Sequence, residues 1–240
     1  MPGYTSFLAL HIAAGTVALA GFWAAAALRK GSPPHRLAGR VYLLAMVLVI
    51  ATGVPLTLQF AFLGRLTFAA FLGYLLLLVS TTVWLSWRAI RDRAHPQRYL
   101  GRAYHALAVA NPAAGLAVLW LGLDRNQPLL VGFSLVGILL GAGMLRRRRI
   151  IPTQPRWWLE EHYGAMVANA AATHIAFLAI GAPRLLPALQ GPTWFYLAWF
   201  GPLVLSIAAR VWLDRRFRLG NLTAGAPVPR ETAMGGGRLP

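Results

Sequence analysis

Long apolar runs recur along the whole chain, and they constrain its fold more than any other feature. Apolar residues make up 58% of the 240 residues and charged residues only 12%, about half the charged share of a typical soluble domain. This composition excludes both an ordinary soluble domain and a disordered chain. Seven runs have 17 to 25 residues each, enough to cross a hydrocarbon core ~30 Å thick at ~1.5 Å per residue. They cover residues 4–28, 41–63, 67–87, 103–123, 129–145, 159–180 and 194–213.

The predicted fold is therefore all-α, a polytopic transmembrane helix bundle with seven spans. We expect residues 1–218 to form the transmembrane domain. Residues 219–240 lose periodicity and gain Gly and Pro, which predicts a disordered cytoplasmic tail. The chain has no cysteine, so disulfides, thiolate metal sites and Cys-ligated clusters are excluded.

The basic residues are distributed unevenly between the two sides of the predicted bundle. Lys and Arg number 23 against 6 acidic residues, a net charge of +17. Twenty of the 23 follow the first, third or fifth span or lie in the end of the seventh span and the tail, whereas only Arg65, Arg125 and Arg184 lie on the other side. Because basic loops stay in the cytoplasm, this predicts a membrane protein with its N-terminus outside and its C-terminus inside. We expect the basic side to bind anionic lipid headgroups, and we expect no nucleic acid partner.

A short motif is repeated at the entry of two spans. The pattern R-x-x-G-R-x-Y occupies residues 36–42 before the second span and residues 98–104 before the fourth, and residues 156–163 form a weaker third copy. The repeat predicts helical hairpins in the same orientation with the seventh helix appended. Its arginines, Arg36, Arg40, Arg98 and Arg102, have two interpretations. They reach lipid phosphates at a helix entry, or they bind a substrate, haem propionates or a quinone headgroup.

These features resemble an uncharacterised bacterial family of predicted multi-helix integral membrane proteins. The resemblance rests on His11, on the turn from Lys30 to Tyr42 and on the Trp-containing entry of the sixth span. It implies the multi-helix membrane fold and a location in the bacterial inner (plasma) membrane, and it brings no established activity. Glu160 and Glu161 depart from the more basic entry of the sixth helix in that family.

Four histidines within the spans are candidate cofactor ligands. His11 and His174 each lie ~10 Å from the outer end of their span at ~1.5 Å per residue, and His105 and His162 lie near the cytoplasmic ends of theirs. Histidine pairs at two depths are what two b-type haems need for electron transfer across a membrane. The prediction is a haem-b electron-transfer protein with a quinone or other redox partner.

Helical geometry restricts this haem interpretation. His162 and His174 are twelve residues apart, which places them ~120° apart around one helix at ~100° per residue. Two stacked haems sharing that helix would therefore be strained, whereas a single haem stays open. The simpler interpretation is that each histidine hydrogen-bonds a neighbouring helix or a lipid phosphate.

A second functional class uses the uncharged polar groups. Asn111 precedes Pro112 inside the fourth span, Asn169 lies midway in the sixth, and Gly53 and Pro55 interrupt the second. Such groups at the bilayer midplane are typical of a small-molecule or ion transporter, in which freed backbone groups line a cavity. The same residues also act as polar contacts between helices. A non-catalytic membrane assembly factor is the third class.

An enzymatic function stays uncertain, and no catalytic residue can be assigned. A membrane metallohydrolase fits poorly because zinc needs three or four convergent ligands and the sequence has no HxxxH or HExxH. No metal is expected beyond haem iron. The glycines of the fifth span, Gly132, Gly137, Gly141 and Gly143, predict close helix packing or a homo-oligomer.

Overall fold

The computed structural model describes residues 2–224, which form helices and no β-strand. The helices are α1 (Pro2–Ala27), α2 (Pro33–Phe62), α3 (Leu66–Arg91), α4 (Pro96–Tyr99), α5 (Arg102–Asp124), α6 (Pro128–Arg147), α7 (Trp157–Ala176), the π-helix η1 (Phe177–Gly181), α8 (Ala182–Leu185) and α9 (Pro192–Ala224). Seven stretches are long and apolar enough to span a membrane, and the sixth combines α7, η1 and α8 as Trp157–Leu185. The predicted seven-span all-α class is confirmed.

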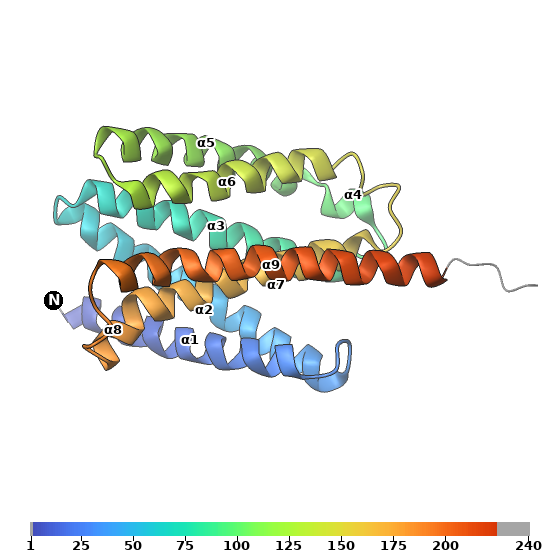
Figure 1. Ribbon diagram of the computed structural model, residues 1–240, viewed down its shortest axis with the longest axis horizontal. Helices are drawn as coiled ribbons and strands as arrows, with labels where there is room; N and C mark the ends of the chain where they lie inside the picture. The colour runs from blue at the N-terminus through green and yellow to red at the C-terminus, as the bar shows by residue number, and fades with distance from the viewer. Residues whose placement is uncertain (1, 225–240) are drawn as a thin grey trace, which may run out of the picture.

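Local sequence signals explain where the helices begin and end. Proline occupies the first helical turn of α2, α4 and α6, where its missing N–H costs no hydrogen bond. The Ser32 hydroxyl accepts a hydrogen bond from the backbone N–H of His35 at 3.3 Å and caps α2. Gly64, at a φ of +73°, allows the three-residue connection between α2 and α3. Tight connections of this kind make consecutive long helices antiparallel (Figure 1).

Helix α7 lies at the centre of the bundle. The α1–α2 and α5–α6 pairs have the most extensive contacts, while α7 packs on α3 and α9 and touches α1. Figure 1 shows the two pairs on opposite sides, with α7 and α9 between them. Residues on α7 can therefore contact side chains from most of the other helices.

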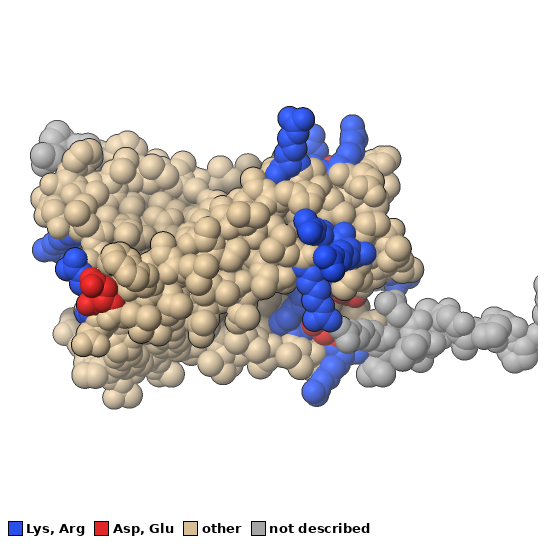
Figure 2. Space-filling model, turned by 90° about the horizontal axis from the view of Figure 1, so that it is seen from above, with Lys and Arg blue, Asp and Glu red and all other residues tan. Residues whose placement is uncertain are grey.

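The two ends of the bundle differ strongly in charge. Figure 2 shows Lys and Arg gathered at one end, which we call the basic end, where α1, α3, α6 and α9 finish and α2, α5 and α7 begin. Large apolar side chains such as Leu44, Trp120 and Leu139 are exposed between the two ends. An exposed apolar belt on seven long apolar helices suits lipid rather than water. These features identify an integral membrane protein.

Glycines bring α5 and α6 into backbone contact. A Cβ atom on Gly141 would lie 2.2 Å from Pro112 Cδ, and one on Gly137 would lie 2.8 Å from the backbone oxygen of Asn111. Gly132 instead faces Phe200 of α9, and a Cβ on Gly143 would meet nothing within 4 Å. Three of the four glycines thus serve packing within the chain.

The C-terminal helix extends beyond the predicted domain boundary. Helix α9 continues to Ala224, past residue 218, where we expected the transmembrane domain to end. The remainder of the predicted tail, residues 225–240, lies outside the described residues.

The predicted orientation can be tested with single cysteines because the chain has none. Gln127 lies between α5 and α6, Thr153 lies between α6 and α7, and both are exposed at opposite ends of the bundle. In intact cells, a membrane-impermeant maleimide should label the Gln127→Cys variant. It should label Thr153→Cys only after permeabilisation, because the basic end is expected inside. The reverse labelling pattern would contradict the predicted orientation.

Candidate functional site

A row of polar contacts follows one face of α7. His162, Asn169 and Thr173 are separated by seven and four residues, which places them within ~40° of one another around the helix axis at ~100° per residue. His162 Nδ1 lies 3.1 Å from the backbone oxygen of Ser86. The Thr82 hydroxyl donates to Asn169 Oδ1 at 2.6 Å. We call this row, with Tyr42 at its far end, the polar seam; it joins α7 to α3 and α2.

The far end of the polar seam is a buried hydroxyl pair. Tyr42 OH lies 3.1 Å from Thr173 Oγ1, which donates to the backbone oxygen of Asn169 at 2.9 Å. Tyr42 and Asn169 have no exposed surface. Hydrogen bonds of this kind hold apolar helices in one register where lipid provides no hydrophobic driving force.

Asn111 forms a second polar contact on a face of α3 that is ~100° around the helix axis from the first. This fully buried side chain donates through Nδ2 to Thr81 Oγ1 at 2.9 Å and to the backbone oxygen of Leu107 at 2.7 Å. Thr81 and Thr82 are consecutive, so α3 presents one hydroxyl to α5 and the next to α7. Both asparagines singled out in the sequence therefore bind threonines of the same helix.

Each buried asparagine keeps one polar atom without a partner among the described residues. These atoms are the acceptor Asn111 Oδ1 and the donor Asn169 Nδ2. A buried polar atom without a hydrogen bond costs roughly 1–3 kcal/mol, and native proteins contain few of them. The core between α3, α5 and α7 thus offers one free acceptor and one free donor.

The outer pair of candidate haem ligands lies at two different levels. His11 Nδ1 is hydrogen-bonded to Thr52 Oγ1 at 2.9 Å, between α1 and α2. The ring of His174 packs edge-on against Phe22 and Trp23, with centroids 5.4 and 5.6 Å away. Phe22 follows His11 by eleven residues, a rise of ~16 Å along α1. The structure therefore does not bring His11 and His174 together.

The other pair is also separated. His105 is exposed on α5, with Nδ1 3.2 Å from the backbone oxygen of Gly101, whereas His162 faces α3 in the polar seam. Among the described residues, no three His, Cys, Asp or Glu side chains gather as a metal site. His174 Nε2 is buried without a partner, but no second histidine of the four contacts it. The haem assignment stays a prediction.

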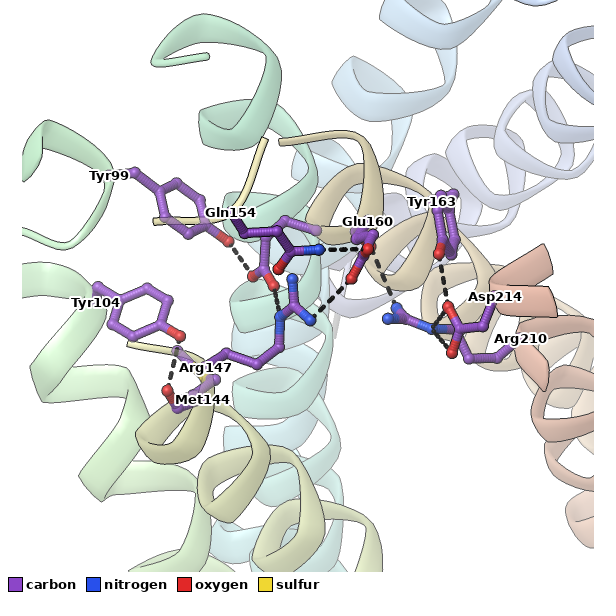
Figure 3. A network of polar contacts seen from close by, with 10 residues as sticks. Tyr99, Tyr104, Met144, Arg147, Gln154, Glu160, Tyr163, Arg210 and Asp214 are labelled. Carbon is purple, nitrogen blue, oxygen red and sulfur yellow. Dashed lines mark hydrogen bonds and ion pairs between the residues drawn. The ribbon is translucent and has the colours of Figure 1, made fainter. Parts of the chain in front are cut away.

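A network of charged and tyrosine side chains closes the basic end of α7 (Figure 3). The Arg147 guanidinium, at the end of α6, pairs through Nε with Glu161 and through Nη1 with Glu160, the latter at 3.0 Å. Glu161 is only 8% exposed, and its Oε2 accepts a hydrogen bond from Tyr99 OH at 2.6 Å. Burial and the Glu161 carboxylate raise the pKa of Tyr99 well above its usual value. Tyr99 therefore stays a neutral donor.

The same network continues to α9. Arg210 donates through Nη1 to the backbone oxygen of Glu160 at 3.2 Å and pairs with Asp214 at 3.0 Å. Tyr163 OH donates to Asp214 at 2.5 Å. The guanidinium passes over Gly164, where a Cβ would lie 1.5 Å from Arg210 Nη1. We call Tyr99, Arg147, Gln154, Glu160, Glu161, Tyr163, Arg210 and Asp214 the ionic network; it connects α4, α6, α7 and α9.

Sequence reasoning did not find this network. In the sequence, the adjacent acids Glu160 and Glu161 stand at the interface and depart from the resembled family, and neither feature predicts their partners. The sequence does carry one signal for the network: Glu160 and Glu161 are two of only six acidic residues in the chain, and they follow the basic run that contains Arg147. A buried acid so close to a basic run needs a partner from it.

The tyrosines of the repeated motif, rather than its arginines, enter the core. Tyr42 and Tyr104 have no exposed surface, and Tyr104 OH donates to the backbone oxygen of Met144 at 2.8 Å. The arginines stay exposed at the basic end: Arg36, Arg40, Arg98 and Arg102. Their exposure leaves headgroup or substrate binding as a prediction, with the basic end as its location.

Comparisons with known proteins add no relative to this description. No family model matches the chain, and no curated protein and no solved structure matches it either. The resemblance based on His11 and the turn from Lys30 to Tyr42 therefore stays a prediction. What the fold and the site define is a class, a seven-helix integral membrane protein with a buried, uncharged polar core.

Proposed function

We propose that the protein binds a small, neutral, polar solute in the core between α3, α5 and α7 and conducts it across the membrane. The observation that supports this most is the unpartnered acceptor Asn111 Oδ1 and the unpartnered donor Asn169 Nδ2, both on fully buried side chains. A solute that both donates and accepts hydrogen bonds would satisfy each of them. Pro112 lies midway along α5, and the π-helix η1 follows α7 toward the outer end of its span. Both loosen the helical backbone, as is typical of such sites.

The charge distribution supports a neutral solute. On the described helices, acidic and basic side chains lie near the two ends; along α7 and α8 none occurs between Glu161 and Arg184. Moving an ion through this stretch would leave its charge unpaired in a medium of low dielectric constant, which is strongly unfavourable. Hydroxyl, amide and imidazole groups can instead exchange hydrogen bonds with an uncharged solute.

Solute flux into proteoliposomes tests this function. With urea and glycerol as probes, stopped-flow light scattering should show faster swelling than in protein-free liposomes. Asn111→Leu and Asn169→Leu should each reduce the protein-dependent rate at least tenfold, since each removes polar atoms of the site. Ser134→Ala is the matched control, because this buried hydroxyl donates to Val131 within its own helix.

Two results would contradict the proposal. One is a swelling rate equal to that of protein-free liposomes for both probes, and the other is an unchanged rate in both asparagine variants. The first result would favour the alternative of a non-catalytic assembly factor. The haem prediction has its own test on the same purified protein, a reduced-minus-oxidised absorption spectrum.

A further inference from the structure

The second copy of the repeated motif is broken where the first is continuous. Residues 36–42 lie within α2, but the chain turns at Leu100 and Gly101, between α4 and α5. The position held by Leu37 in the first copy is held by Tyr99 in the second. Leu37 is 64% exposed, whereas Tyr99 has no exposed surface. Because of the break, this position of the motif lies at the surface in the first copy and inside the bundle in the second.

Tyr99 fills the basic end of the space between the three helices that carry the polar core. Its ring lies 5.9 Å from that of Trp84 on α3, 5.3 Å from Tyr104 on α5 and 4.7 Å from Trp157 on α7. Asn169 follows Glu161, the partner of Tyr99, by eight residues, ~12 Å along α7. Tyr99 thus separates the buried amides from the surface of the basic end.

Polar contacts hold Tyr99 in this position. Tyr99 OH binds Glu161, which Arg147 pairs, and Arg88 donates through Nη2 to the backbone oxygen of Arg98 at 2.8 Å. Arg147 Nη2 and Gln154 Oε1 are buried without partners among the described residues. Water that reaches this end can bind these atoms and compete for the others.

The opposite end of the core is closed differently. Phe71, Phe133 and Trp199 pack there with ring centroids 5.4 to 5.6 Å apart. These three rings belong to an apolar cluster, and their one polar atom is the indole N–H of Trp199. The hydroxyl of Tyr74 in the same cluster already donates to the backbone oxygen of Phe133 at 2.8 Å and accepts from the N–H of Gly137 at 2.7 Å. The closure at the basic end is therefore the one that hydration can release.

We propose that Tyr99 and Glu161 form a gate that opens the polar core to the basic end when their hydrogen bond breaks and α4 moves outward. The open gate is the path by which the solute of the proposed function reaches the basic end, and this role of the gate rests on the proposed function. Its opening, however, can be measured without any solute.

Thiol accessibility measures the gate directly, since the chain contains no cysteine of its own. Ala165 is the reporter position: it is buried on α7, four residues from both Glu161 and Asn169. In nanodiscs, a membrane-impermeant methanethiosulfonate should modify Ala165→Cys slowly. Adding Tyr99→Phe or Glu161→Leu, which remove the donor or the acceptor of this hydrogen bond, should raise the rate by about tenfold, the effect expected from a lost hydrogen bond to a charged group.

Matched controls separate gating from general loosening. Tyr104→Phe removes a buried hydroxyl that binds Met144 rather than Glu161, so it should leave the rate unchanged. Ala171→Cys, in the apolar cluster toward the other end of α7, should stay slow in every background. Equal rates at position 165 with and without the gate variants would overturn the proposal, as would a parallel rise at position 171.

The outcomes also distinguish the gate from the proposed function. A rise at position 165 without any urea or glycerol flux supports the gate and contradicts solute conduction. Flux without any change at position 165 supports conduction and contradicts the gate.

Discussion

Replacing Arg147 with methionine is expected to lower the free energy of unfolding in detergent by about 3 kcal/mol, because removing one partner of a buried ion pair leaves an uncompensated charge. The Arg147 and Glu161 side chains are 23% and 7% exposed. Without the guanidinium, Glu161 keeps the hydrogen bond from Tyr99 but loses its countercharge. Titration with SDS, followed by helical circular dichroism, measures the change.

A second substitution separates charge burial from lost packing. In Arg147→Met/Glu161→Gln, the amide oxygen can still accept from Tyr99 but carries no charge, so the double variant should regain more than half of the lost stability. Arg125→Ala is the control, since the pair of Arg125 with Asp124 is 61% and 48% exposed and should contribute less than about 1 kcal/mol. A double variant no more stable than the single one would show that lost packing, not the unpaired charge, causes the destabilisation.

The fold could be predicted because a membrane imposes its requirement on each span separately. Every span must satisfy its own backbone hydrogen bonds and present apolar side chains to lipid, so length and hydropathy are sufficient signals. The predicted run 129–145, for example, corresponds to α6 at Pro128–Arg147. How the helices pack depends on side-chain pairs between spans, and no single span carries that information.

The polar core could be predicted only in part, for the same reason. Asn111 and Asn169 were identifiable as polar residues deep in apolar runs. Their partners Thr81 and Thr82 were not, because threonine is common in transmembrane helices and the α3–α5 and α3–α7 contacts are not encoded locally. Sequence analysis therefore found half of each hydrogen-bonded pair.

Tyr99 shows a different limit. Its position in the repeated motif predicts the same environment as Leu37, yet one side chain is buried and the other exposed. The difference arises from the Glu161 acceptor and the aromatic partners, which lie up to 62 residues away in the sequence. Depths counted from span ends have a similar weakness. The similar depths of His11 and His174 follow only if all spans end in the same two planes.

The second large effect is expected at Gly141. A Cβ atom there would lie 2.2 Å from Pro112 Cδ and 2.8 Å from the backbone oxygen of Ala108, and neither a proline ring nor a backbone oxygen can rotate away. Gly141→Ala should therefore push α6 away from α5 and lower the free energy of unfolding by about 2 kcal/mol, as overpacking of a tight core does.

Gly143 makes this prediction specific to the helix contact. It lies two residues further along α6, and a Cβ there would meet nothing within 4 Å. Alanine disfavours the unfolded chain relative to glycine, so Gly143→Ala should be neutral or stabilising by up to about 1 kcal/mol. The sign of the difference between the two variants is the test, measured by the same SDS titration. If both alanines changed stability equally, the close α5–α6 approach at Gly141 would be contradicted, because helix propensity alone acts on the two positions alike.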